Sequence, residues 1–293
     1  MTDRESTAFE SEGVECAAWH YPGDGDSVVV MAHGFAGTRR MRLPAYAERF
    51  AERGLGVLLF DYRTFGDSEG EPRNHVDPFR HVTDWRAAVR HARSLGYERL
   101  GVWGTSFSGG HALVTAANED VDAYVGQTPF YDGVRTLLHI TQQSGLGFAL
   151  EATKAGLDDT LRGLLGRDPR YVPAVAQPGE LAAMNTPGSD EGYRSMVPDE
   201  LDEDEWNRVT ARFLLPLLLY RPIDYADDVD CPAFVAAARE DQLVPGSAVE
   251  KTVTRLADVE RLWFDGDHFD VYTGEGFEKV SEREAEFLER HLL

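Results

Sequence analysis

The stretch from Leu100 to His111, LGVWGTSFSGGH, constrains the fold of this chain more than any other. An apolar run, typical of a buried strand, leads directly into Ser106 and then into Gly109 and Gly110 at the start of a helix. A serine on such a sharp turn holds its hydroxyl clear of the sheet, with the next backbone amide facing the same side. Ser106 is therefore a candidate nucleophile, although a tight strand-to-helix connection without chemistry gives the same local pattern.

The residues around Ser106 depart from the common GxSxG pattern at one position. Gly104 supplies the small residue before the serine, but Ser108 stands where the second glycine is usual. The departure bears on the geometry of the turn. It does not change which residue is the candidate nucleophile.

Apolar runs and helical periodicities alternate at both ends of the chain. Strands are expected at 14–21, 27–32, 56–60, 100–104, 121–128, 232–238 and 259–264, and helices at 44–53, 76–95, 107–117, 248–256 and 277–292. This alternation predicts an α/β fold with a mostly parallel twisted sheet flanked by helices.

From residue 130 to residue 228 the alternation stops and strand signals are absent. Helices are expected there at 134–143, 148–165 and 203–219. An unstructured loop of this length is improbable inside a compact domain. We therefore expect a core of residues 1–129 and 229–293, with residues 130–228 inserted as a helical cap.

A serine hydroxyl needs a neighbouring base, and that base needs a carboxylate to hold it in one tautomer. In enzymes that carry a nucleophilic serine on such a strand-to-helix turn, these partners come in the order serine, acid, histidine, each on a loop after a strand. His268 comes directly after the strand expected at 259–264, and Asp241 comes after the strand before it. We predict that His268 is the base and Asp241 the acid. Asp132, which follows an earlier strand, is the alternative acid.

A tetrahedral intermediate also needs hydrogen-bond donors aimed at its oxyanion. The amide of Phe107, next to the candidate nucleophile, is one predicted donor, and the amide of Phe35 in the turn after residue 32 is the other. His33 is expected to make structural hydrogen bonds in this turn. Asp61 and Arg63 are expected to pair with each other and brace the loop.

Five segments carry a resemblance to a known family: MAHGFAGTRRMRLPAYAERFAERGLGVLLFDYRTFGDSEGEPR, TDWRAAVRHARSLG, WGTSFSGGH, AREDQLVP and GDHFDVY. Together they resemble the α/β-hydrolase superfamily over residues 27–128 and 230–272. They are most similar to an esterase-like group that includes polyketide-associated hydrolases and enzymes labelled acetyl xylan esterase or prolyl dipeptidyl-peptidase-type serine peptidases. The resemblance implies Ser106 as nucleophile, Asp241 as acid, His268 as base, and the amides of Phe35 and Phe107 as oxyanion donors.

These residues predict a serine hydrolase that cleaves a small, ester-like molecule through an acyl-enzyme. A serine aminopeptidase or an acyltransferase would use the same triad, and a non-catalytic binding protein on this scaffold is the alternative of another class. No cofactor or metal is expected, because the sequence has neither a ligand cluster nor a phosphate-binding glycine loop. Apolar cap residues predict an acyl pocket, a cap core or a homodimer face: Leu137, Leu138, Phe148, Leu214, Leu215 and Leu218.

The chain is strongly acidic, with 29 basic against 51 acidic residues and a formal net charge of −22. Such a surface repels nucleic acid and anionic lipid, so neither is an expected partner. The polar start, the short apolar run Phe213–Tyr220 and the two cysteines, Cys16 and Cys231, predict a cytoplasmic protein with reduced thiols. Its basic residues include only three lysines, a composition that resembles proteins of salt-loving microbes.

We expect salt to stabilise the folded chain. Repulsion among the acidic side chains acts over about 10 Å at 0.1 M salt but over only about 3 Å at 1 M. The midpoint of thermal unfolding, Tm, should therefore rise when sodium chloride is raised from low to molar concentration. A Tm that stays flat or falls over this range would refute the expectation.

Overall fold

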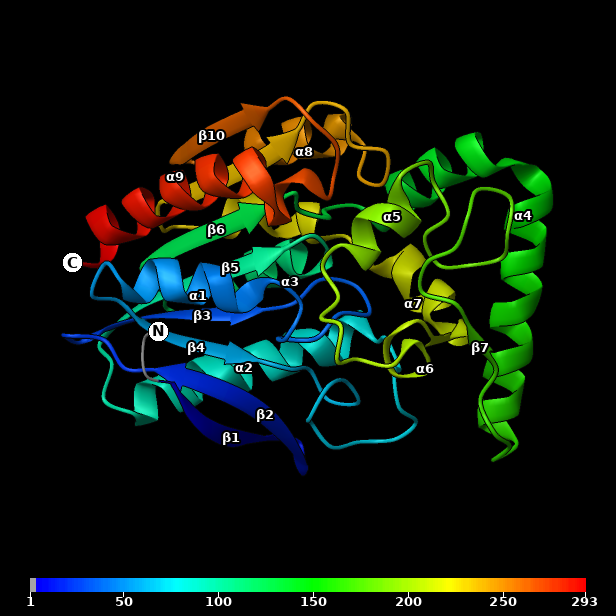
Figure 1. The fold of residues 1–293 in the computed structure, drawn as a ribbon, viewed down its shortest axis with the longest axis horizontal. Coiled ribbons are helices and arrows are strands. Elements are labelled where there is room, and N and C mark those ends of the chain that lie inside the picture. Colours follow the sequence, from blue (N-terminus) through cyan, green and yellow to red (C-terminus); the bar gives the residue numbers. More distant parts are fainter. Residues whose placement is uncertain (1–3) are drawn as a thin grey trace.

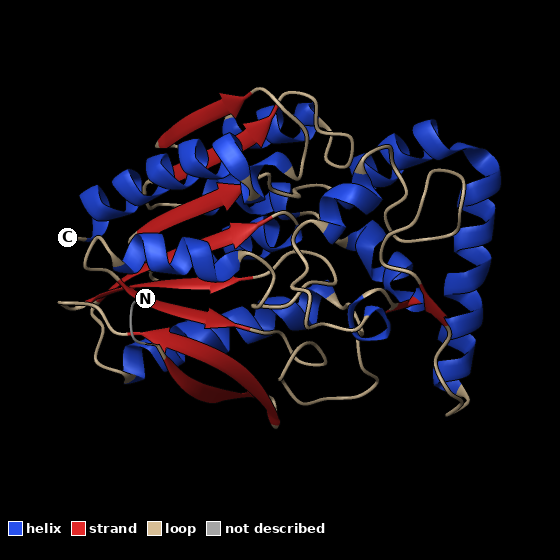
Figure 2. Cartoon of the chain, in the orientation of Figure 1, coloured by secondary structure: helices blue, strands red, loops and turns tan. Residues whose placement is uncertain are grey.

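In the computed structural model, which describes residues 4–293, an eight-stranded sheet runs through the molecule (Figures 1 and 2). The strand order is β1-β2-β4-β3-β5-β6-β9-β10. The bounds are β1 (Glu5–Ser11), β2 (Val14–Tyr21), β3 (Ser27–Ala32), β4 (Gly56–Phe60), β5 (Arg99–Thr105), β6 (Ala123–Gln127), β9 (Ala233–Ala238) and β10 (Val259–Phe264). The strands β4, β3, β5, β6, β9 and β10 all run parallel to one another, which confirms the predicted fold class.

Helices cover both faces of the sheet (Figure 1). α1 (Leu43–Ala51) and α9 (Gly274–Leu292) pack on one face, whereas α2 (Pro78–Ser94), α3 (Phe107–Ala116) and α8 (Gly246–Val253) pack on the other. Every residue of β3 and β4 is buried. Burial on both faces explains why these strands are continuous apolar runs in the sequence.

The sequence predicted no strand before Val14, and this was wrong. β1 pairs antiparallel with β2 through a turn at Glu12 and Gly13, which have φ angles of 50° and 78°. β1 is polar because it is the edge strand and most of its side chains are exposed or half-buried. Its inward-facing Phe9 is buried against Phe60 of β4, with the ring centroids 5.5 Å apart.

Between β6 and β9 the chain leaves the sheet and lies beyond the carboxyl ends of the parallel strands, on the right in Figure 1. This segment contains α4 (Gly133–Leu164), β7 (Tyr171–Val172), α5 (Ser189–Arg194), α6 (Glu203–Trp206), β8 (Val209–Thr210), α7 (Leu214–Leu219) and the 3-10 turns Ala211–Phe213 and Pro222–Asp228. The division of the chain into a core and a cap stays a prediction.

Two expectations for this segment were wrong. The expected helix 203–219 is broken, because β-branched Val209 and Thr210 pair with β7 as a short antiparallel strand. That pairing also contradicts the absence of strands. The two helices expected at 134–143 and 148–165 are both present: they form the two parts of α4, which meet at a non-helical Gly145 where φ is 85° and ψ is 165°.

Cys16 is buried in β2 and Cys231 is half-buried before β9, and both are free thiols. Within residues 4–293, no helix combines the length and the apolar character that crossing a membrane would require.

Helix α9 buries one carboxylic acid against the central strand β5. The indole Nε1 of Trp103 donates to Glu284 Oε2 at 2.8 Å, and both side chains are fully buried. Burial raises the pKa of Glu284 from 4.5 to about 8, against the smaller, opposite effect of the indole hydrogen bond. The folded chain therefore holds a proton that the unfolded chain releases above pH 4.5.

Replacing this acid should stabilise the fold at alkaline pH. Protonated Glu284 is favoured in the folded chain, and the stability that this contributes is lost as pH rises from 4.5 to about 8, because the unfolded chain loses the proton first. The free energy lost is about 1.4 kcal/mol for each unit by which the two pKa values differ. Glu284→Gln should therefore gain free energy of unfolding relative to the unaltered chain as pH rises from 5 to 8, measured by urea denaturation at constant salt. Glu286→Gln, on the exposed face of α9, is the control. Parallel pH profiles for the Glu284→Gln variant and the unaltered chain would contradict this expectation.

Candidate active site

Ser106 occupies the turn between β5 and α3 in a backbone conformation that residues other than glycine rarely adopt, with φ of 55° and ψ of −121°. The turn is fixed from both sides: Ser106 N donates to the carbonyl of Gln127 at 2.7 Å, and its carbonyl accepts from the amide of Phe130 at 2.9 Å. A Cβ on Gly104 would stand 2.2 Å from the carbonyl oxygen of Ser108. The glycine before the serine is therefore required by the close approach of strand and helix.

The hydroxyl of Ser108, where a glycine is usual, has a buried partner. Its Oγ lies 2.6 Å from the phenol oxygen of Tyr62, which accepts a hydrogen bond from Trp85 Nε1 at 2.8 Å. Since Tyr62 accepts from the indole, its own proton is free to point to Ser108. The sequence did not predict this pairing, because Tyr62 and Trp85 lie on other elements. Its only signal was a serine where a glycine is usual.

The structure brings the three predicted triad residues together at the carboxyl edge of the sheet. His268 Nε2 lies 3.0 Å from Ser106 Oγ, and His268 Nδ1 lies 2.8 Å from Asp241 Oδ2. The histidine is 2% exposed, so these contacts are shielded from bulk water. A carboxylate only accepts hydrogen bonds, so Nδ1 carries the proton and Nε2 can accept from the serine hydroxyl.

A second aspartate fixes the loops that carry this histidine and its acid. Asp267 Oδ1 accepts from the amides of Gln242 at 3.0 Å and His268 at 2.7 Å, and so ties the loop after β9 to the loop after β10. Asp241 Oδ1 accepts from the amides of Leu243 and Val244 at 2.8 and 2.7 Å, which leaves Oδ2 for the imidazole. The sequence did not predict this positioning function of Asp267.

Asp132, the alternative acid, is engaged elsewhere. It caps α4, with Oδ1 accepting from the amide of Arg135 at 3.1 Å, and its Oδ2 lies 3.4 Å from the guanidinium groups of Arg135 and Arg221. Its carboxylate stabilises the start of a helix. Asp241 is the carboxylate that contacts His268.

The two predicted oxyanion donors lie beside the serine. Phe107 is the first residue of α3, a position whose amide has no partner inside the helix. A Cβ on Gly34 would stand 3.0 Å from Ser106 Cβ, so the turn carrying Phe35 packs directly on the serine. Among the hydrogen bonds of residues 4–293, neither the Phe35 nor the Phe107 amide is a donor. Their part in binding an oxyanion stays a prediction.

The expected pairing of Asp61 with Arg63 was wrong. Asp61 binds the backbone amide of Arg39 at 2.6 Å and its guanidinium, whereas Arg63 binds Asp84 of α2 at 2.7 to 2.8 Å. The chain turns after β4, with the amide of Phe65 donating to the carbonyl of residue 62, and so directs Arg63 to α2. Asp61 still braces the turn after β3, but through a different arginine.

His33 makes structural hydrogen bonds in that turn, as expected. Its Nδ1 lies 2.9 Å from the carbonyl of Gly34, and its Nε2 lies 3.5 Å from the amide of Tyr62. Complete burial lowers the pKa of the imidazole, so the ring is neutral.

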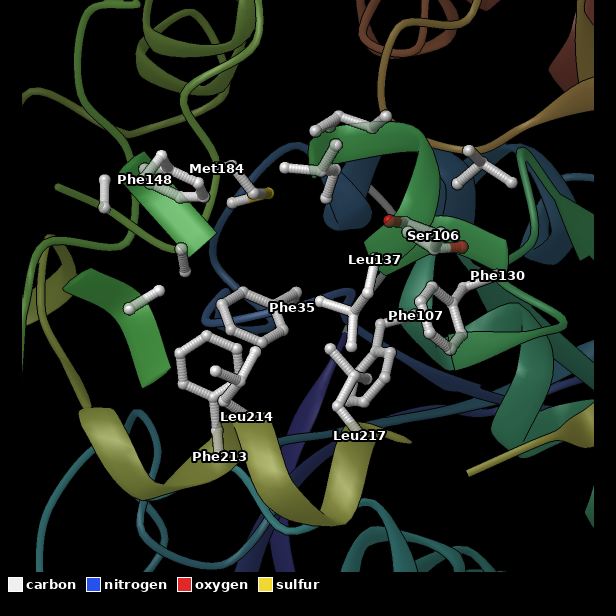
Figure 3. Close-up of a pocket in the computed structure, with 17 residues that line it drawn as sticks. Phe35, Ser106, Phe107, Phe130, Leu137, Phe148, Met184, Phe213, Leu214 and Leu217 are labelled. Atoms are coloured by element: carbon white, nitrogen blue, oxygen red, sulfur yellow. The ribbon is translucent and has the colours of Figure 1, made fainter. Parts of the chain in front are cut away.

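An apolar pocket with an empty volume of about 670 Å³, its open mouth included, adjoins the serine (Figure 3). Ser106 lies at one side, and Phe148 and Met184 lie at the other. Leu137, Phe148 and Leu214 line it, as the sequence allowed, whereas Leu138 and Leu218 are exposed. The sequence did not single out the other residues between 130 and 228 that line it: Phe130, Thr136, Ile140, Ala152, Ala182, Ala183, Met184, Phe213 and Leu217.

The parallel strand order and the serine on a strand-to-helix turn are features of enzymes with the α/β-hydrolase fold. The chain belongs to the alpha/beta hydrolase family, whose model matches residues 29–281. The expected resemblance is thereby confirmed.

Three comparisons place the chain among known proteins. It is 37% identical to the quorum-quenching protein AidA of Acinetobacter baumannii, over 96% of this chain and 93% of that protein. It is 28% identical to a polyketide transferase of Aspergillus fumigatus, over 99% of both chains. The crystal structure of the alpha/beta hydrolase GrgF from Penicillium superposes with a TM-score of 0.83, at 23% identity and over 99% of both chains.

Proposed function

We propose that this protein is a serine hydrolase that cleaves carboxylic esters through an acyl-enzyme. One observation carries the proposal: Asp241, His268 and Ser106 form a hydrogen-bonded chain that ends at an apolar pocket. This chain of contacts forms only when the loops after β9 and β10, which are distant from Ser106 in the sequence, meet the strand-to-helix turn. The same chain of contacts counts against a non-catalytic binding protein, which has no use for a serine bonded to an oriented imidazole.

In the proposed reaction, Ser106 Oγ attacks the ester carbonyl carbon while its proton passes to His268 Nε2. Asp241 stabilises the imidazolium, and the amides of Phe35 and Phe107 donate to the oxyanion. When the bond to the leaving oxygen breaks, that oxygen takes the proton from Nε2. Water then attacks the acyl-enzyme, giving its proton to Nε2, and the acid leaves as Ser106 regains the proton.

The charge of the site disfavours an aminopeptidase. Such an enzyme needs a carboxylate to hold the ammonium group of its substrate. No aspartate or glutamate is found among the described residues that line the two cavities touching Ser106. An uncharged ester therefore fits these walls better than a free amino terminus does.

Acyl transfer to an acceptor other than water is the second candidate. It is favoured by the similarity to a polyketide transferase over nearly the whole chain. The first half of that reaction, formation of the acyl-enzyme, is identical to the first half of ester hydrolysis. The two candidates differ only in what attacks the acyl group afterwards.

Substitution of the serine tests the nucleophile. Ser106→Ala should abolish turnover of a short-chain aryl ester and labelling by a fluorophosphonate probe, because no other hydroxyl is bonded to His268 among the described residues. Ser108→Ala, two residues away, is the matched control and should still be labelled. Undiminished turnover by the Ser106→Ala variant would refute the assignment.

Substitution of each candidate acid by its amide tests which aspartate orients the base. Asp241→Asn should lower kcat by about 10²- to 10⁴-fold, because an amide no longer fixes the imidazole tautomer. Asp132→Asn keeps a good helix-capping side chain and should change kcat by less than about threefold. A large loss in the Asp132→Asn variant, with little loss in the Asp241→Asn variant, would reverse the assignment.

A further inference from the structure

Two of the cavities formed by the described residues open onto Ser106. Besides the apolar pocket of Figure 3, a smaller cavity with an empty volume of about 380 Å³ touches Ser106 on the side of the imidazole. His268 lines the smaller cavity and does not line the larger. Three residues line both: Phe35, Ser106 and Met184.

Proton transfer decides which part of an ester enters which cavity. The leaving oxygen must come within hydrogen-bond reach of His268 Nε2, since it takes its proton from that atom when the bond to the acyl carbon breaks. The leaving group must therefore extend on the side of the imidazole, into the smaller cavity. The acyl chain, attached to the same carbon, is left with the larger cavity.

We infer that the active site has two compartments, separated by Met184 and Phe35, in which the larger takes an apolar acyl chain and the smaller takes a small, uncharged leaving group. This inference rests on the proposed function and specifies its substrate class. Met184, on the segment between β7 and α5, lies across the pocket from Ser106, whereas Phe35 belongs to the turn after β3 that packs on the serine.

The walls of the compartments match this division. The polar side chains among the described residues of the larger wall are Ser106 and Thr136, so an apolar chain meets apolar contacts along its length. The smaller compartment has tyrosines, but their hydroxyls are already used. Tyr193 OH donates to the carbonyl of Phe35 at 3.2 Å, and Tyr272 OH is bonded to Thr105 Oγ1. The described residues of this wall include no aspartate, glutamate, lysine or arginine, so a charged leaving group would lose its hydration without a permanent opposite charge to replace it.

Two isomeric esters test the assignment. Ethyl octanoate and octyl acetate have the same atoms and nearly the same hydrophobicity, but the long chain lies on the acyl side in one and on the alcohol side in the other. We expect kcat/KM, followed by release of acid, to be at least about tenfold higher for ethyl octanoate. An equal or higher value for octyl acetate overturns the compartment assignment.

Substitutions in the larger wall and in the partition test the same assignment. Leu217→Trp, which fills the larger compartment, should lower the ratio of kcat/KM for ethyl octanoate to that for octyl acetate by about tenfold. Leu219→Trp is the matched control: it lies two residues along α7, is 75% exposed and should leave the ratio unchanged. Met184→Ala, which removes the partition, should move the ratio towards one. Circular dichroism and fluorophosphonate labelling verify that each variant is folded.

Failure of this inference and failure of the proposed function give different results. If the unaltered protein is not labelled by the fluorophosphonate, the proposed function fails and the inference falls with it. If the protein is labelled but prefers octyl acetate, consumes neither ester or keeps its ratio in the Leu217→Trp variant, only the compartment assignment is overturned.

Discussion

The hydrogen bond between His268 and Asp241 is the interaction on which the rest of the site depends. Without it the imidazole is free to rotate and to exchange tautomers, and the nucleophile that we propose, Ser106, has no oriented base. The distance of 2.8 Å is reached because the loops after two neighbouring parallel strands are joined by Asp267, which accepts amide hydrogen bonds from both. A parallel sheet supplies the geometry, since the carboxyl ends of its strands all lie at one edge.

The serine contributes the second constraint, a strained backbone. Its positive φ requires that β5 and α3 approach each other closely, and the small residues around the turn make this approach sterically feasible. The buried hydroxyl of Ser108 is tolerated only because Tyr62, itself bonded to Trp85, lies within hydrogen-bond distance. The turn therefore carries one buried polar contact to the helix layer behind the sheet.

Much of the core was predictable from local patterns. Buried strands such as β3 and β4 begin and end where their apolar runs do, because both faces of the sheet are covered and nothing interrupts the run. Of the three residues that meet at the site, Ser106 was found from its turn motif, and Asp241 and His268 were found from their positions after the last two strands. β1 was missed because an edge strand buries few side chains and is polar in sequence. The sequence did not predict that Asp61 pairs with Arg39 and that Arg63 pairs with Asp84, because pairing between side chains of different elements leaves no spacing signal in the sequence. Met184 and Leu217 were missed because only the packed segment shows which apolar side chains face the serine.

A structure of the protein after reaction with a long-chain alkylphosphonate ester tests the central claim most directly, because the tetrahedral phosphorus mimics the intermediate. The predicted result is a covalent bond from phosphorus to Ser106 Oγ, with the phosphoryl oxygen about 3 Å from the amides of Phe35 and Phe107 and His268 still bonded to Asp241. Phosphorus attached to another residue, or an imidazole separated from both Ser106 and Asp241 in that adduct, would contradict it.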